Sequence, residues 1–146
     1  MTTTCDEFLS IMKSRGAHTA PGASARTITL LNSALRERRY AMLPKFMIDL
    51  YERCGGLNMG NGYIFGPTEI LYSGTYPTPS LESVNNDFSM LNKTRGQTIF
   101  GRNDLFWFAF DAFGNFYMLD NLTLTPLRKY DDAYKCMFDC LIAGKF

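Results

Sequence analysis

Residues 97–120 read QTIFGRNDLFWFAFDAFGNFYMLD and carry the strongest β-strand pattern in the chain. Side chains alternate between the two faces of a strand, so Phe106, Phe108 and Phe110 share one face while Trp107 and Ala109 lie on the other. Both faces are apolar, which is typical of a central strand that is covered on both sides. The stretch therefore predicts the middle of a β-sheet.

A tight turn is predicted inside this stretch, and further strands on either side of it. Gly114 and Asn115 are the residue types that short hairpin turns favour, so the segments before and after them are expected to pair. A short strand is predicted at 63–65 and another at 123–130. Pro126 places the latter at an edge, because proline has no N–H to donate across a sheet interior.

Helical spacing of apolar residues is found before and after this β-rich region. Helices are predicted over 4–15, 26–39 and 44–54, over a short segment that Ser80 caps, and over a C-terminal segment that begins at Asp131 or Asp132 and ends at Gly144. This order predicts an α+β fold, with a mostly antiparallel sheet of about four to six strands packed with N-terminal and C-terminal helices. The Gly/Pro-rich segment GAHTAPGASA (16–25) predicts a linker. We therefore divide the chain into an N-terminal helix and linker (1–23) and an α+β domain (24–146).

The stretch LPKFMIDLYERCGG (43–56) predicts a complete short helix. Pro44 suits the first turn, where its missing N–H would have no partner in any case. Apolar residues then recur at three-to-four spacing as far as Cys54, which gives one buried stripe. Gly55 is expected to end the helix in the left-handed conformation that glycine adopts without steric cost.

The composition indicates a folded domain rather than a disordered chain. The 146 residues include 46% hydrophobic and 20% charged residues and carry a net charge of +1. This balance does not indicate binding of the whole molecule to nucleic acid or to an anionic membrane. The N-terminus MTTTCDEFLS lacks the features of a signal peptide, and the longest apolar run, Leu105–Phe110, is far shorter than the roughly 20 residues of a membrane helix. We expect a cytoplasmic location and four cysteines that are free thiols.

Histidine and cysteine, the residues most often used as nucleophiles and metal ligands, form no familiar motif. The single histidine, His18, lies in the expected linker. Cys136 and Cys140 are four residues apart on a helix, but structural zinc needs four Cys or His ligands. The glycine-rich segment GGLNMGNG (55–62) matches no phosphate-binding motif. We predict no metal site and no cofactor, and the third hypothesis for function, an enzyme that uses Cys54 or Cys140, ranks last.

Two further patterns have ordinary structural explanations. Asp104, Asp111 and Asp120 stand beside predicted turns, where aspartate accepts backbone hydrogen bonds, so we assign no catalytic carboxylate pair. The aromatic run 106–110 is similar to the stacking surface of a single-strand nucleic-acid binder, but no Lys or Arg interrupts it, which favours a core. We therefore expect no catalytic residue, no enzymatic activity and no nucleic-acid partner.

The order of three motifs resembles the SUKH superfamily, which joins yeast Smi/Knr-type cell-wall regulators to many bacterial immunity proteins. The motifs are LPKFMIDLYERCGG (43–56), YIFGPTEI (63–70) and the hairpin IFGRNDLFWFAFDAFGNFYMLD (99–120), with a helix after them. Cys54 stands where the family often has Asn before the paired glycines. The resemblance covers about residues 24–143, and it implies that the Leu-Pro helix is scaffold and that the protein acts by binding.

The resemblance thus implies an immunity protein that neutralises a cognate secreted bacterial toxin, such as a nuclease or deaminase. The alternative is a regulatory scaffold of the Smi/Knr type with a cellular partner. Protein interfaces favour Tyr and Arg, and polar loop residues beside the sheet are the candidates for partner binding. The predicted partner-binding residues are Glu69, Tyr72, Tyr76, Asp87, Arg102, Asp104 and Asp111.

Overall fold

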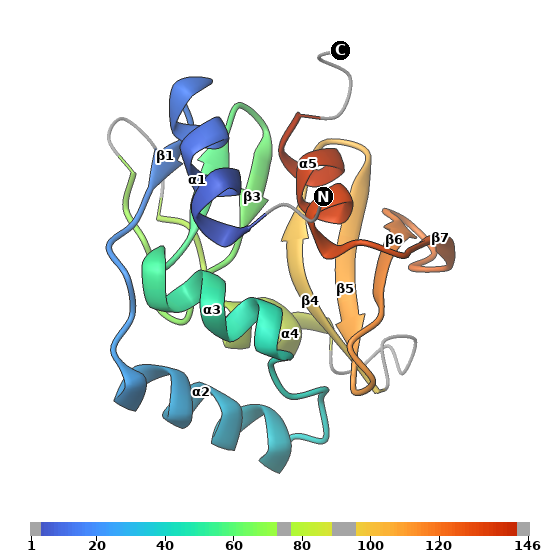
Figure 1. The fold of residues 1–146 in the computed structure, drawn as a ribbon. Helices are drawn as coiled ribbons and strands as arrows, with labels where there is room; N and C mark the ends of the chain where they lie inside the picture. Colours follow the sequence, from blue (N-terminus) through green and yellow to red (C-terminus); the bar gives the residue numbers. More distant parts are fainter. Residues whose placement is uncertain (1–3, 73–76, 89–95, 143–146) are drawn as a thin grey trace.

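The fold is α+β, as the sequence predicts, with helices packed against an antiparallel sheet (Figure 1). The computed structural model describes residues 4–72, 77–88 and 96–142. The helices in these ranges are α1 (Cys5–Ser14), α2 (Ala25–Glu37), α3 (Lys45–Arg53), α4 (Leu81–Phe88) and α5 (Ala133–Ile142).

The described strands form one sheet in which each strand pairs antiparallel with the next along the chain. They are β1 (His18–Thr19), β2 (Leu57–Met59), β3 (Gly62–Ile64), β4 (Gln97–Arg102), β5 (Phe106–Asp111), β6 (Phe116–Asp120) and β7 (Pro126–Tyr130). The sheet has more strands than the four to six expected. The reason is that β1 and β2 have only two and three residues, too few for an alternating pattern to show.

Strand β5 is the central strand that its two apolar faces predict. It lies between β4 and β6, and Phe108, Ala109 and Phe110 are fully buried. The hairpin turn between β5 and β6 is also where it was expected, with Gly114 in a left-handed conformation. Pro126 begins β7, which is an edge strand, so that prediction is confirmed as well.

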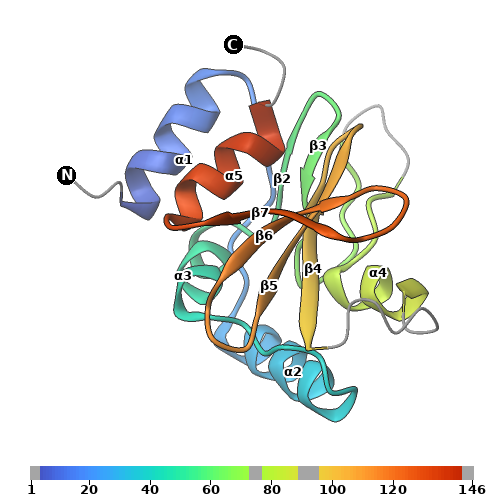
Figure 2. The ribbon, with the colours of Figure 1, turned by 90° about the vertical axis from the view of Figure 1, so that its right-hand side faces the viewer.

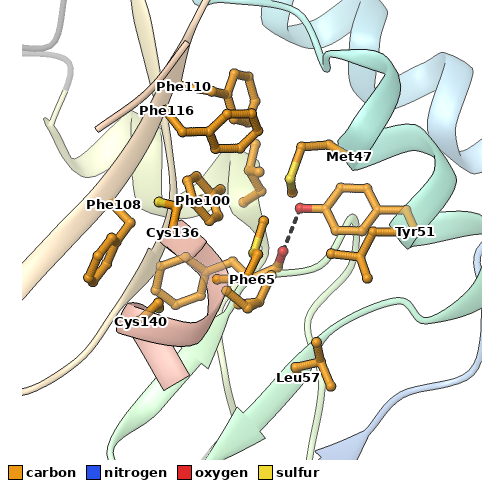
Figure 3. Close-up of a cluster of buried hydrophobic side chains, with 14 of the residues drawn as sticks. Met47, Tyr51, Leu57, Phe65, Phe100, Phe108, Phe110, Phe116, Cys136 and Cys140 are labelled. Atoms are coloured by element: carbon orange, nitrogen blue, oxygen red, sulfur yellow. Dashed lines mark hydrogen bonds between the residues drawn. The ribbon is translucent and has the colours of Figure 1, made fainter. Parts of the chain in front are cut away.

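Helix α5 covers one face of the sheet and contacts every strand from β2 to β7 (Figure 2). Its residues Cys136, Met137 and Cys140 are completely buried. Figure 3 shows the side chains of this core, among them Tyr51 of α3, whose hydroxyl donates a hydrogen bond to the carbonyl oxygen of Phe65. The helices and the sheet thus share one apolar core.

Helix α1 belongs to this core. Its Phe8 and Met12 are fully buried, and the Phe8 ring lies 5.6 Å from the ring of Tyr134 and 5.2 Å from that of Phe138, both on α5. The segment after α1, expected to be a linker, also contains β1, in which His18 pairs with Asn58 of β2. The division of the chain after residue 23 stays a prediction, but the described residues before it pack with those after it.

Some helix ends have the structure that the local sequence predicts, and one has a structure that depends on tertiary packing. The side chains of Ser80 and Asp132 accept hydrogen bonds from Ser83 N and Tyr134 N, as their predicted capping roles require. Helix α3 ends at Arg53, close to the predicted end, but the predicted conformation of Gly55 is wrong, because Gly55 is not left-handed. Gly55 instead donates its N–H to the carbonyl oxygen of Pro21 (3.0 Å), and a Cβ at this position would lie 2.6 Å from that oxygen.

Candidate functional site

A groove of about 710 Å³ lies between α4, the segment 77–79 and the strands β3 to β5. Its lining is mostly aromatic or otherwise apolar, with one acidic and one basic side chain. This size and this composition are typical of binding pockets. The residues that line it are Tyr63, Phe65, Pro77, Thr78, Pro79, Val84, Asp87, Phe88, Arg102 and Trp107.

The floor of the groove is a row of side chains across three strands. Arg102 of β4 pairs with Tyr63 of β3 on one side and with Trp107 of β5 on the other. The preceding residue, Gly101, faces α5, because a Cβ there would meet Cys140 Sγ at 3.0 Å. Since successive residues of a strand point to opposite faces, the row formed by Tyr63, Arg102 and Trp107 lies on the face away from α5.

The Trp107 ring is the centre of an aromatic cluster in this groove. The guanidinium carbon of Arg102 lies 5.0 Å from the centre of the ring, within the range of a cation–π contact. Phe88 of α4 meets Trp107 edge to face at 4.9 Å between ring centres, and the Phe65 ring lies 6.4 Å away. These contacts hold Trp107 and Arg102 in one arrangement.

The two charged residues of the groove are available to a partner. Both Asp87 and Arg102 are exposed. Within the described ranges 4–72, 77–88 and 96–142, neither side chain makes an ion pair or a hydrogen bond. A binding partner can therefore pair with these charges without first breaking an ion pair among those residues.

Helix α4, one wall of the groove, is hydrogen-bonded to β4 through the side-chain amide of Asn85. The side chain of Asn85 donates to the carbonyl oxygens of Leu81 and Ile99 and accepts from the N–H of Ile99, all at 2.8 Å. These contacts lie beside an irregularity in β4 between Ile99 and Gly101, where β3 pairs only with Gly101 and Arg102. The Asn85 amide thus takes the place of a neighbouring strand.

The opposite wall belongs to a loop whose two arms are joined by a β-bridge between Ile70 and Thr78. The second arm, 77–79, lines the groove. The first arm, 67–71, lines a second depression of about 430 Å³ together with residues of the segment 20–27. Glu69 lies in that second depression, so the loop separates it from Asp87 and Arg102.

Of the predicted partner-binding residues that the structure describes, only Asp87 and Arg102 line the same groove. Tyr72 is 6% exposed, so its ring is not available as the surface anchor that we expected. Tyr76 lies outside the described residues. Asp104 is exposed and accepts a hydrogen bond from Asn61 Nδ2 at 2.6 Å.

Asp111 has the structural role that its position beside a turn predicts. Its carboxylate accepts hydrogen bonds from the N–H groups of Phe113 and Asn115, from Asn115 Nδ2 and from the Tyr117 hydroxyl. Partial burial alone would raise the pKa of Asp111, but these hydrogen bonds outweigh it and hold the pKa below its usual value. The carboxylate is occupied by its own turn.

The aromatic lining of the groove is what the sequence analysis missed. The run 106–110 was assigned to the core as a whole, whereas Trp107 is partly exposed and faces the groove. A usable signal was present, because Arg102 and Trp107 lie on either side of Asn103 and Asp104, residue types that favour turns, and a hairpin places such residues opposite each other. Phe65 and Phe88 carry no comparable signal, since their meeting depends on the path of the whole chain.

The cysteines are free thiols, and Cys54, Cys136 and Cys140 are buried. Burial raises the pKa of each of these three thiols, which opposes the thiolate form that nucleophilic attack requires. Within the described part of the chain, no three His, Cys, Asp or Glu side chains gather in a way that could hold a metal ion. None of the described helices is both long enough and apolar enough to cross a membrane.

Comparison with known proteins does not assign the chain to a group. No protein-family model matches it, and no curated protein shows significant similarity to it.

Proposed function

We propose that this protein is a non-catalytic binding protein of the cytoplasm, an immunity protein that neutralises a cognate secreted bacterial toxin. The proposal follows from the SUKH-like order of motifs at 43–56, 63–70 and 99–120. The observation that carries the binding role is the exposed Arg102 stacked over Trp107 in an aromatic groove. Arg, Trp and Tyr are the side chains that contribute most to binding at protein interfaces.

The groove suits a protein partner for a second reason. Its aromatic side chains are already held in place by contacts with one another, so little side-chain entropy is lost when a partner binds. The exposed charges of Asp87 and Arg102 lie beside the apolar side chains of the groove, and an apolar core with polar groups beside it is the usual arrangement of an interface.

The test is growth of bacteria that express the product of the adjacent gene, with and without this protein, followed by co-purification. Rescue of growth together with a stoichiometric complex supports the proposal. A toxic neighbour that this protein neither binds nor neutralises contradicts it. A harmless neighbour also contradicts it and favours the alternative, a regulatory module of the Smi/Knr type with a cellular partner.

The complex also allows the interface to be mapped by charge reversal. The variants Glu69→Lys and Asp104→Lys change exposed residues that lie outside the aromatic groove. If either residue contacts the toxin, the variant weakens the complex and leaves the thermal melting temperature unchanged. Unchanged affinity removes that residue from the interface.

A further inference from the structure

We infer that the aromatic groove binds a segment of the partner protein in which an acidic side chain accompanies an apolar one. In this arrangement Arg102 pairs with the carboxylate, and the apolar side chain packs against the rings of Trp107 and Phe88. The inference rests on the proposed function for the identity of the partner, which is the toxin. The chemistry of the segment is argued from the groove alone.

The first step concerns Arg102. Its guanidinium is held over the Trp107 ring, and none of the residues in 4–72, 77–88 and 96–142 pairs with it. A guanidinium stacked on an aromatic ring keeps its N–H groups in its own plane, directed outward and free to bind a carboxylate through two parallel hydrogen bonds. Because the stacking already restricts the side chain, the group is set in position before the ligand arrives.

The second step concerns the apolar part of the ligand. Around Trp107, the rings of Phe65 and Phe88 and the side chains of Pro77 and Pro79 line the same groove. A space of about 710 Å³ exceeds what one carboxylate needs, and most of the side chains that line it are apolar. An aromatic or aliphatic side chain next to the carboxylate fills this space and excludes water from the ion pair.

The third step concerns Asp87, the acidic residue of the groove. It stands on α4, a wall of the groove, whereas Arg102 stands on β4, in the floor of the groove. A carboxylate near Asp87 is repelled and one near Arg102 is attracted, which sets the direction in which an acidic segment lies. The charges therefore favour an acidic segment beside Arg102 in the floor and hydrogen-bond donors beside Asp87 on the wall.

The experiment uses the full chain, whose only tryptophan is Trp107, so that intrinsic fluorescence reports directly on the groove. The probes are capped hexapeptides that carry one Phe and one Glu at every relative spacing, each with a counterpart in which Gln replaces Glu. We expect at least one Phe/Glu peptide to give a saturable change and its Gln counterpart to bind about tenfold more weakly. The variant Arg102→Gln should lose the same factor, and Arg102→Lys should recover part of it.

The matched control is Arg36→Gln, which removes an exposed arginine of α2 outside the groove and should bind the peptides as the unaltered chain does. Three results would overturn the inference: no saturable change at any spacing, equal affinity for the Glu and Gln peptides, or unchanged affinity of Arg102→Gln. A different probe that binds better, such as an oligonucleotide, also overturns it.

The two proposals fail separately. Peptide binding that depends on Arg102, without any rescue from a toxin, leaves the groove chemistry standing and refutes the immunity function. Rescue and complex formation that are the same for Arg102→Gln and for the unaltered chain refute the groove chemistry and leave the immunity function standing.

Discussion

Replacing Asn85 with alanine should strongly destabilise the protein, because the Asn85 side chain provides the hydrogen-bond partners for the backbone groups of Ile99 where β3 and β4 diverge. Asn85 is 1% exposed, and its amide binds both the N–H and the carbonyl oxygen of Ile99, a residue that is itself fully buried. Truncation leaves these two strand groups without a partner and opens a small cavity. Each unsatisfied buried group costs about 1–3 kcal/mol, so the expected loss in the free energy of unfolding from the two groups is about 2–6 kcal/mol.

This loss is a large fraction of the total free energy of unfolding of a domain, which is about 5–15 kcal/mol. Urea unfolding followed by circular dichroism and by Trp107 fluorescence measures it. With an m-value of about 2 kcal/mol/M, the urea midpoint should fall by about 1–3 M. The variant Ser83→Ala, at an exposed position of the same helix, is the control and should stay within about 0.5 kcal/mol of the unaltered chain.

A second variant, Asn85→Leu, separates the hydrogen bonds from the volume of the side chain. It keeps a side chain of similar size but restores none of the three hydrogen bonds. We expect it to be nearly as unstable as Asn85→Ala. The reasoning is refuted if Asn85→Leu has the stability of the unaltered chain, or if Asn85→Ala unfolds at the same urea concentration as that chain.

Three further predictions test other parts of the fold. Gly66→Ala should lower the free energy of unfolding by at least about 3 kcal/mol or prevent folding, because the new Cβ would overlap the backbone oxygen of Gly55. Gly16→Ala places its Cβ in open space and should lower the free energy of unfolding by only about 1–2 kcal/mol, because the backbone at this position is left-handed; urea unfolding of both variants measures the difference. The pKa of Asp111 is lowered in the folded protein, so its carboxylate stabilises the fold fully above the pKa of about 3.9 that aspartate has in the unfolded chain, and this stabilisation is lost as the pH falls below that value. The urea midpoint of Asp111→Asn should therefore depend less on pH between about 5 and 2.5 than the midpoint of the unaltered chain. Iodoacetamide at pH 8 should modify the half-buried Cys5 before the fully buried Cys140 in the folded protein, and mass spectrometry measures the order of modification. Modification of Cys140 first would contradict the packing of α5.

The class of the fold and several of its local features follow from the sequence alone. Hydrophobic periodicity separates helices from strands, and two apolar faces mark β5 as a central strand. Ser80 and Asp132 cap helices, and Pro126 begins an edge strand, because capping and the missing N–H of proline act within a few residues. These features depend on short-range physical chemistry, which a sequence pattern records.

The groove and its surroundings are decided by the tertiary structure. Whether Trp107 lies in the core or faces a partner depends on what covers each face of the sheet, and both faces of β5 look alike in the sequence. Tyr72 was expected at the surface and is buried, and Gly55 was expected to end α3 and instead allows the segment around Pro21 to approach. Such outcomes depend on residues that are distant along the chain, so only the complete packing of helices against the sheet determines them.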